Sequence, residues 1–418
     1  MQHKGLRLPA RWRLGYDGRE KNSHLTGDFT MKGRILLGLC AAALIAGPAA
    51  AQDKLRIGFI NTTSGPQAVI GKHMQDGWIL GLEMLGNKIG GVETEMFYGD
   101  DQAKPDVGVQ LAERMVKRDH VNFVAGIIWS NVLLAVAPVV TESNTFLVST
   151  NAGASPMAGK QCSKDFFTSS WQNDQTPEAM GKLMQDAGVK NVYEISPNYQ
   201  AGKDMLTGFE RYYKGGIKGQ ILFKLTQQDF QAELSQIRAA KPDAVFAFVP
   251  GSWGISFFKQ FDAAGLRKDI KLYTAFSVDE VTLPAMGDTA VGTFVTGFWS
   301  HDLDVPQNKK FVEAFKKKFN YDPSLFAAQS FDGVYLIDSG VKGVKGDLKN
   351  RNGIRAAMLK ADYPSVRGKY TYNTNHFPIQ SFYKMEVVKD ASGKVMLKNR
   401  GAVFKDHKDS YAKECKMS

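Results

Sequence analysis

The sequence predicts an α/β protein with two separate parallel sheets, each covered by helices. Apolar segments of strand length alternate with segments in which apolar residues recur every three or four positions, the spacing of one helix face. This alternation starts near residue 55 and again near residue 190, and short turns separate its members. Alternating strands and helices with short turns favour right-handed crossovers, and hence parallel strands. A chain of 418 residues is long enough for two or three packed units.

The first series opens with an apolar strand at 55–62 and a turn at 63–66. Apolar residues then recur at spacings of four, four, four and three, which predicts a helix with one buried face. They are Ile70, Met74, Trp78, Leu82 and Leu85. The series continues with expected strands at 92–98, 121–128 and 145–150 and expected helices at 106–118 and 132–142.

The second series has the same alternation. Its expected strands lie at 192–196, 219–225, 244–249, 271–276 and 292–299, and its expected helices lie at 201–213, around 230–237 and at 252–264. A polar stretch with a proline, 171–177, separates the two series, and two further helices are expected at 308–319 and 325–341. Residues 369–403 alternate aromatic and polar side chains about a turn at Gly393, which predicts a hairpin.

Residues 31–51 have the organisation of a secretory signal peptide. Lys32 and Arg34 precede an apolar stretch at 35–46, and three alanines at 49–51 form a site for cleavage after Ala51. An apolar stretch this short does not cross a bilayer, which takes ~20 residues. We therefore expect translation to start at Met31, residues 1–30 to be a mis-assigned extension, and the mature chain to be periplasmic. An N-terminal arm that forms part of the structure is the alternative for 1–30.

Export leaves two cysteines in the mature chain, Cys162 and Cys415. An oxidising compartment favours one disulfide between them, which would tie the C-terminal tail to the segment after the fourth strand. Two buried free thiols are the alternative.

The charge pattern argues against nucleic acid as a partner. Of the formal net charge of +11, residues 1–51 carry +5, which leaves +6 on residues 52–418. The longest basic run in that part is Lys316–Lys318. Binding of nucleic acid needs a concentrated basic face, and we expect a mildly basic monomer instead.

No catalytic motif is present. Gly251–Gly254 has the wrong spacing for a nucleophile elbow, and 153–160 lacks the spacing of a phosphate loop, with Gln161 in place of its Ser or Thr. His301–Asp304 is the one candidate metal cluster, but a solvated loop is the better interpretation. Asp100 and Asp101 could form an acid/base pair, but two carboxylates after a strand are more often a turn and a helix cap. We expect no enzyme, no cofactor and no metal site.

Ligands of open parallel sheets sit beyond the carboxyl ends of the strands, where helix N-termini and loop amides converge. Two such sheets facing one another form a cleft. The turns after the strands should therefore carry the site, and they are Thr63–Gly65, Trp129–Asn131, Asn151–Gly153, Asn198–Tyr199, Gly251–Trp253 and Ser277–Asp279.

The segment LRIGFINTTSGPQAVIGKHMQDGWILGLE resembles the opening of the type I periplasmic solute-binding proteins of the branched-chain amino acid transporter family. Further matching segments are YGDDQAKPDVGVQLAERMV, GIIWSNVLLAVAPVV, KPDAVFAFVPGSWGISFFKQF, GDTAVGTFVTGFW and AAQSFDGVYL, and the resemblance runs from Leu55 to about Val388. It implies two lobes joined by three crossing strands. It also implies a ligand held between the lobes and delivery to an importer made of inner-membrane permease subunits and cytoplasmic ATPases. Lobe 1 is then expected at 52–172 and 301–370, lobe 2 at 173–300 and 371–404, and a tail at 405–418.

The resemblance also implies how the ligand is held. Its carboxylate would meet the Ser130 hydroxyl and the amides of 129–131, with further amides from Asn151, Ala152 and Gly153. Ser64 belongs to the first loop of the same cleft. Amide donors at a helix N-terminus suit an anion, although Ser130 or Asn131 as a simple helix cap is the alternative.

Two departures from the family count against an amino acid as ligand. Gly153 stands where amino-acid binders commonly have Thr, and Ile70 stands at an aromatic position. Asp279 is the candidate partner for an ammonium group. The segments TNAGASPMAGKQC and SSWQNDQ look more like the subgroup that takes aromatic carboxylates. Four aromatic side chains would then form a slot for the ring of the ligand. They lie in the turns named above and at the end of the fourth strand of the second series, and packing in the core is the alternative role for each. They are Trp129, Tyr199, Trp253 and Phe276.

The sequence thus predicts the substrate-binding component of an importer, with an aromatic acid favoured as its ligand. A branched-chain or other amino acid is the alternative ligand. A sensory binding protein is the alternative role.

Overall fold

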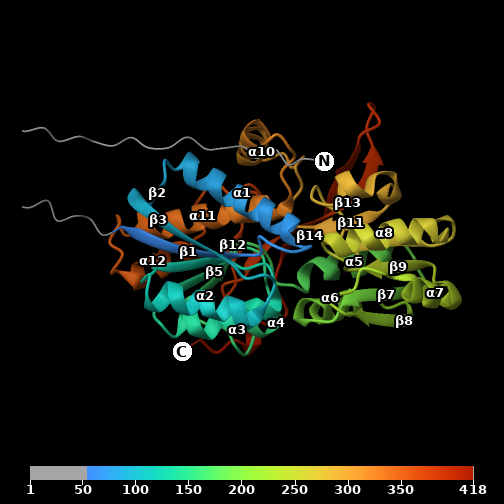
Figure 1. The fold of residues 1–418 in the computed structure, drawn as a ribbon, viewed down its shortest axis with the longest axis horizontal. Coiled ribbons are helices and arrows are strands. Elements are labelled where there is room, and N and C mark those ends of the chain that lie inside the picture. The colour runs from blue at the N-terminus through green and yellow to red at the C-terminus, as the bar shows by residue number, and fades with distance from the viewer. Residues whose placement is uncertain (1–53, 418) are drawn as a thin grey trace, which may run out of the picture. The chain divides into compact units, whose positions relative to one another are not determined.

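The computed structural model describes residues 54–417. The expected extension at 1–30 and the expected signal peptide at 31–51 lie outside these residues. Two sheets dominate the described part, and each is mostly parallel. We call the first sheet with its helices lobe 1 and the second sheet with its helices lobe 2 (Figure 1).

Lobe 1 contains a six-stranded sheet in the order β2-β3-β1-β4-β5-β6. Its strands are β1 (Leu55–Asn61), β2 (Lys88–Ile89), β3 (Val92–Asp100), β4 (Phe123–Gly126), β5 (Phe146–Ser149) and β6 (Phe166–Thr168). All neighbours are parallel except the short hairpin of β2 and β3. Its helices are α1 (Ala68–Met84), α2 (Pro105–Lys117), α3 (Ser130–Thr141), α4 (Ser155–Ala158), α10 (Pro306–Phe319), α11 (Leu325–Gly343) and α12 (Arg351–Leu359).

Helices cover both faces of the lobe 1 sheet. Figure 1 shows α1 and α11 on one side of the sheet and α2 and α3 on the other. Strands β4, β5 and β6 are accordingly buried along their whole length, and Leu55, Ile57, Phe59 and Ile60 of β1 are buried as well. This is the pattern that a two-sided parallel sheet requires.

Lobe 2 contains an eight-stranded sheet in the order β12-β13-β11-β10-β9-β7-β8, with β14 paired to β13. Its strands are β7 (Asn191–Pro197), β8 (Gly216–Phe223), β9 (Ala244–Ala247), β10 (Lys271–Ala275), β11 (Phe294–Gly297), β12 (Thr371–Tyr372), β13 (Pro378–Lys389) and β14 (Val395–His407). Its helices are α5 (Gln175–Asp186), α6 (Gln200–Tyr212), α7 (Gln231–Ala240), α8 (Ser252–Ala263) and α9 (Leu283–Met286). The expected hairpin about Gly393 is present as β13 and β14.

The structure adds elements that the periodicity did not predict. The main ones are α5, which includes the end of the expected polar stretch 171–177, and α12. The first turn of α5 is polar yet fully buried, and the Gln175 and Glu178 side chains find partners elsewhere in the fold. A buried polar helix of this kind has no apolar stripe for a sequence pattern to reveal.

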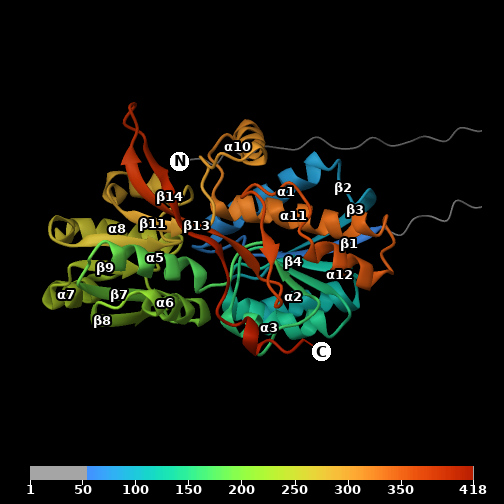
Figure 2. The same cartoon turned by 180° about the vertical axis from the view of Figure 1, so that it is seen from behind.

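Three chain segments join the lobes: 169–174, 298–305 and 360–370. After β14 the chain also returns to lobe 1, where Cys415 forms a disulfide with Cys162. Figure 2 shows the tail that follows β14 running below α3, on the lobe 1 side. Within 54–417, no helix is both long and apolar enough to cross a membrane.

Candidate ligand-binding site

A small cavity of about 30 Å³ lies where the carboxyl ends of strands from both lobes converge. Lobe 1 contributes the turns after β4 and β5, and lobe 2 contributes the ends of β9 and β10 together with α6. We call this the inner cavity. Its lining includes the predicted residues Trp129, Ser130, Asn151, Ala152, Tyr199 and Phe276.

A second cavity of about 390 Å³, the outer cavity, shares Trp129 and Tyr199 with the inner one. The predicted residues Ser64, Asn131 and Trp253 line it. Nine of the eleven predicted ligand-binding residues thus line one of the two cavities, and Gly153 and Asp279 do not. The two shared rings stand between the cavities.

The aromatic rings of the site hold one another in fixed orientations. The Trp129 ring meets Tyr199 and Trp253 edge to face at centroid distances of 6.1 and 5.9 Å. Its indole Nε1 donates to Thr62 Oγ1 at 2.9 Å, which fixes the ring plane. Across the cavity, Trp171 stacks on Phe276 at 4.3 Å. Such pairs contribute roughly 0.5–1.5 kcal/mol beyond their burial, so the walls are preorganised.

Two residues beside the inner cavity have strained backbones. Ile127 follows β4 with φ of 65°, and Phe276 follows β10 with φ of 52°. Positive φ is costly for bulky and β-branched residues and is commonly kept at functional sites. Each of the two strained positions follows the carboxyl end of a parallel strand, one in each lobe.

The N-terminus of α3 points its free amides toward this region. Trp129 is the N-cap residue, and no side chain of the described residues caps this helix end. The first N–H groups of a helix have no partner within it, and the helix dipole adds positive potential there. Neutral donors are therefore available at Ser130 for an anion.

Asn173 fixes the direction of the Ser130 hydroxyl. Asn173 Oδ1 accepts from the Gly153 amide at 3.1 Å, so its Nδ2 is the atom that donates to Ser130 Oγ at 3.0 Å. The same Nδ2 donates to Asp204 Oδ2 at 2.8 Å. Because Ser130 Oγ accepts from Asn173 and donates to no acceptor among residues 54–417, its own proton is free for a ligand.

The turn after β5 is held mainly by internal hydrogen bonds. Asn151 Nδ2 donates to Ile128 O at 2.7 Å, and its Oδ1 accepts from Gln329 at 2.6 Å. The Ala152 amide donates to Ile127 O at 3.1 Å. The Gly153 amide is engaged by Asn173, and a Cβ at this position would lie 2.0 Å from Trp171 O. Gly153 therefore lines neither cavity, and packing against the Trp171 backbone explains why no larger residue stands there.

Asp279 lines neither the inner nor the outer cavity. It is fully buried, and its Oδ1 accepts from the backbone amides of Val281 and Thr282 at 2.9 and 3.0 Å, just before α9. Burial, together with the neighbouring Glu280, raises its pKa to about 7. The structure thus gives Asp279 a local turn and cap environment rather than a place facing a ligand.

No acidic side chain of residues 54–417 lines either cavity. In the same part of the chain, no three His, Cys, Asp or Glu side chains are grouped as metal ligands. Burial raises the pKa of the Tyr199 phenol, so this ring stays neutral. The site thus offers neutral hydrogen-bond donors and aromatic walls.

A larger cavity, about 710 Å³, lies elsewhere and includes His73, Glu280 and Lys394 in its lining. Its charged rim is internally paired, because Lys316 and Lys394 both contact Asp322, at 2.8 and 2.7 Å. Lys72, the third lysine of its lining, contacts Asp76 at 2.5 Å, so each of these lysines already has a carboxylate partner. The size of this cavity alone does not make it the ligand site.

Sequence reasoning missed Asn173, Trp171 and Phe248 as members of the site. Trp171 and Asn173 belong to the segment SSWQNDQ, which was noted for its resemblance but interpreted as a polar connection. The tryptophan in this segment was the available signal, because a tryptophan is buried in most proteins and is unusual in a solvated linker.

Comparisons with known proteins identify the family and the fold of this chain. A family model described as periplasmic binding protein matches residues 54–394. A solute-binding protein of an ABC transporter from R. palustris, solved with benzoate, is 30% identical with a TM-score of 0.82, covering 87% of this chain and 100% of that one. A second protein from R. palustris, solved with 4-hydroxybenzoate, is 27% identical with a TM-score of 0.80, covering 86% and 99%.

A curated relative from Brucella melitensis biotype 1, the Leu/Ile/Val-binding protein homolog 6, is 28% identical over 370 residues. The alignment covers 86% of this chain and 94% of the relative. The predicted fold class, a two-lobed type I periplasmic-binding-protein fold, is confirmed by these neighbours. The chain therefore belongs to the periplasmic binding protein family and is a solute-binding protein of the ABC-transporter type.

Proposed function

We propose that this protein captures an aromatic carboxylate in the inner cavity and delivers it to the permease of an ABC importer. Residues 31–51 would direct the chain to the periplasm. Lobe 1 would comprise 52–172 and 301–370, lobe 2 would comprise 173–300 and 371–404, and a tail would follow.

The free proton of Ser130 is the observation that carries the proposal. Asn173 occupies the acceptor side of this hydroxyl, so the group facing the cavity is a donor, and it stands at an uncapped helix N-terminus. Donors without a fixed positive charge bind a carboxylate well when they are preorganised.

The surroundings favour a ring over an aliphatic amino acid. Trp129, Trp171, Tyr199, Phe248 and Phe276 line the inner cavity, and its described lining contains no carboxylate that could pair with an ammonium group. An ammonium buried without a counter-charge is strongly disfavoured. The proposal is supported further by the two relatives solved with benzoate and 4-hydroxybenzoate.

Entry of a ring requires movement. A cavity of about 30 Å³ has room for roughly two water molecules. We therefore expect an aromatic acid to enter while the lobes are apart, or to displace the Trp129 and Tyr199 rings that stand between the inner and outer cavities. Closure around the ring would then exclude water from the carboxylate site.

A branched-chain amino acid is the second candidate ligand, favoured by the names of the curated relatives. A panel of four compounds separates the candidates by thermal unfolding: benzoate, 4-hydroxybenzoate, benzamide and leucine. A ligand present at 100 times its Kd stabilises by about 2.7 kcal/mol. We expect stabilisation by the two acids only. Stabilisation by leucine without any by the acids would replace the proposal with the second candidate.

A further inference from the structure

We propose that Asp204 is a latch that holds the two lobes together, and that Asn173 couples this latch to the orientation of Ser130. The identity of Ser130 as a ligand group rests on the proposed function. The latch itself concerns contacts between the lobes and does not depend on which ligand binds.

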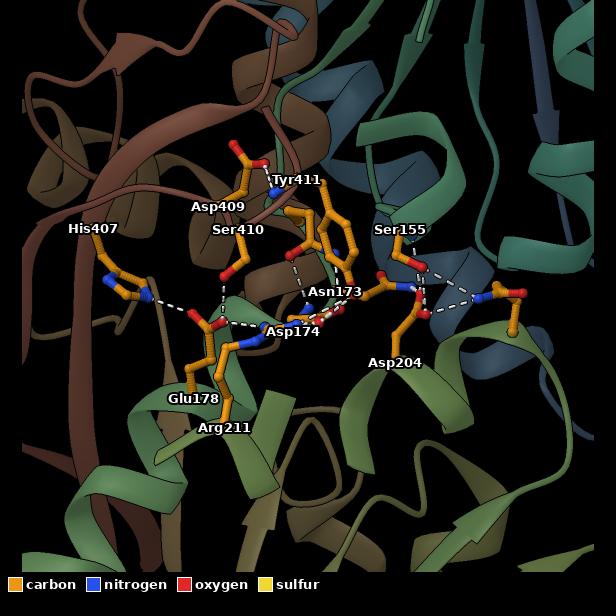
Figure 3. Close-up of polar contacts among 12 residues, drawn as sticks. Ser155, Asn173, Asp174, Glu178, Asp204, Arg211, His407, Asp409, Ser410 and Tyr411 are labelled. Carbon is orange, nitrogen blue, oxygen red and sulfur yellow. Dashed lines mark hydrogen bonds and ion pairs between the residues drawn. The ribbon is translucent and has the colours of Figure 1, made fainter. Parts of the chain in front are cut away.

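Asp204 lies on α6 of lobe 2 and is buried, with 4% of its surface exposed. Its two oxygens accept four hydrogen bonds. Oδ1 accepts from Ser155 Oγ and Gln200 Nε2, both at 2.7 Å, and Oδ2 accepts from the Ser155 amide at 3.1 Å and from Asn173 at 2.8 Å. Only Gln200 belongs to the same helix. Figure 3 shows Ser155 and Asp204 facing one another across the junction.

Ser155 begins α4 of lobe 1, so its two bonds to Asp204 cross from one lobe to the other. No Lys, Arg or His among residues 54–417 forms an ion pair with Asp204. The buried carboxylate therefore depends on these neutral donors. Hydrogen bonds to an ionised group are about twice as strong as neutral ones, which makes this contact a strong tie between the lobes.

Asn173 connects the latch to the ligand site. It lies in the connecting segment 169–174, and its backbone amide donates to Gly153 O at 2.8 Å, so it stays with the lobe 1 turn. Its Nδ2 has two protons. Asp204 takes one and Ser130 takes the other. When the lobes close, the bond to Asp204 fixes the orientation of the Asn173 side-chain amide. The same amide donates to Ser130 Oγ, so the Ser130 proton stays directed at the ligand.

The rest of the polar network in Figure 3 has a different role. Arg211 contacts Asp174 at 2.9 Å and also pairs with Glu178, and all three residues belong to lobe 2 or its boundary. Tyr411 of the C-terminal tail donates to Asp174 at 2.8 Å. These contacts attach the tail to α5 and α6. The hydrogen bonds of this network that run directly between a helix of lobe 1 and a helix of lobe 2 are those between Ser155 and Asp204.

The test uses Asp204→Asn and Ser155→Ala in the mature chain, with Asp338→Asn as the matched control. Asp338 has the same exposure, 4%, but accepts from Gly90 within lobe 1. Small-angle scattering of the ligand-free proteins gives the radius of gyration, and circular dichroism confirms folding. Ser155→Ala removes a single hydroxyl, so it keeps the test valid if Asp204→Asn fails to fold.

We expect both latch variants to be more extended than the wild type without ligand, and the control to match it. We also expect their affinity for benzoate to fall roughly tenfold to a hundredfold, the effect of losing a hydrogen bond to a charged group. Scattering of Asp204→Asn and Ser155→Ala that matches the wild type would overturn the latch. If benzoate fails to bind the wild type, the proposed function fails, but the ligand-free scattering still decides the latch.

Discussion

At the scale of single residues, the ligand site depends on the direction of one hydroxyl proton. Asn173 determines that direction because its amide oxygen is occupied by Gly153 and its nitrogen faces both Ser130 and Asp204. The sequence could indicate Ser130 through its place in the turn before α3. It could not reveal Asn173, because the partners of Asn173 are 20 to 43 residues away along the chain.

Ser130→Ala should weaken binding of the aromatic acid about tenfold to a hundredfold, since a hydrogen bond to a charged group contributes ~1.5–3 kcal/mol. Ser196→Ala is the control: this serine is equally buried, but its Oγ donates to Gly202 O at 3.0 Å within lobe 2. Isothermal titration of both variants measures the difference. Equal affinities for Ser130→Ala and the wild type would place the carboxylate elsewhere.

Asp279→Asn should leave affinity for an aromatic acid within a few-fold, because Asp279 lines neither cavity. Its pKa is raised to about 7, chiefly by burial. In the unfolded chain this pKa is about 3.9. Between these values the folded state holds a proton that the unfolded state has released, so this group makes stability fall as the pH rises.

Replacement of Asp279 by asparagine removes this titration, while the side-chain oxygen of the asparagine can still accept from the backbone amides of Val281 and Thr282. The melting temperature of Asp279→Asn should therefore exceed that of the wild type at pH 8, and the gap should shrink at pH 5. Calorimetry at the two pH values checks this. A large loss of ligand affinity in the variant would instead indicate an ammonium-bearing ligand.

At the scale of elements, the N-terminus of α8 makes one of the contacts between the lobes. Gly251 is the N-cap residue of α8 with φ of 62°, and Gln67 Oε1 of lobe 1 accepts from the Ser252 amide at 3.2 Å. A Cβ on Gly251 would lie 2.1 Å from that oxygen. The backbone conformation at Gly251, with φ of 62° and ψ of −132°, favours glycine, and a Cβ would also push the Gln67 side chain away from the Ser252 amide.

Gly251→Ala should disturb closure and weaken ligand binding by several-fold or more. Gly265→Ala is the control, because Gly265 also has positive φ, 71°, but nothing lies within 4 Å of its Cβ position. Both variants should lose roughly 1–2 kcal/mol of stability from backbone strain. Titration calorimetry should show reduced affinity in Gly251→Ala alone, and equal affinities would contradict a role for this contact in closure.

The C-terminal tail is the second element with a testable role. Cys415 joins it to Cys162 of lobe 1, at a sequence separation of 253 residues. Replacing both cysteines by serine should lower the free energy of unfolding by about 2–4 kcal/mol. A reducing agent should lower the stability of the wild type similarly and leave the double variant unchanged. No change in either experiment would mean that the bridge does not support the fold.

Most elements could be predicted because their apolar residues follow the period of a strand or a helix. The exceptions have physical reasons. The first turn of α5 buries Gln175, Thr176 and Glu178, so its inner face is polar. β6 is three residues long, too short for periodicity to reveal. The loop positions of Tyr199 and Phe276 could be anticipated, but their contacts across the lobes depend on how the two sheets approach one another.

At the scale of the whole molecule, two sheets with their strand ends facing each other create a site that neither lobe contains alone. Lobe 1 supplies the donors at α3, and both lobes supply rings to the walls. The two-lobed arrangement followed from two separate strand–helix series together with the family resemblance. The volume of the inner cavity could not be predicted from the sequence, because it depends on how Trp129 packs against Tyr199 and Trp253.

A crystal structure of the mature protein grown with benzoate tests the central claim most directly. We expect the carboxylate within hydrogen-bonding distance of the Ser130 hydroxyl and the first amides of α3, and the ring among Trp129, Tyr199 and Phe276. Benzoate bound instead in the large cavity beside His73 and Lys394, or absent while an amino acid fills the cleft between the lobes, would contradict it.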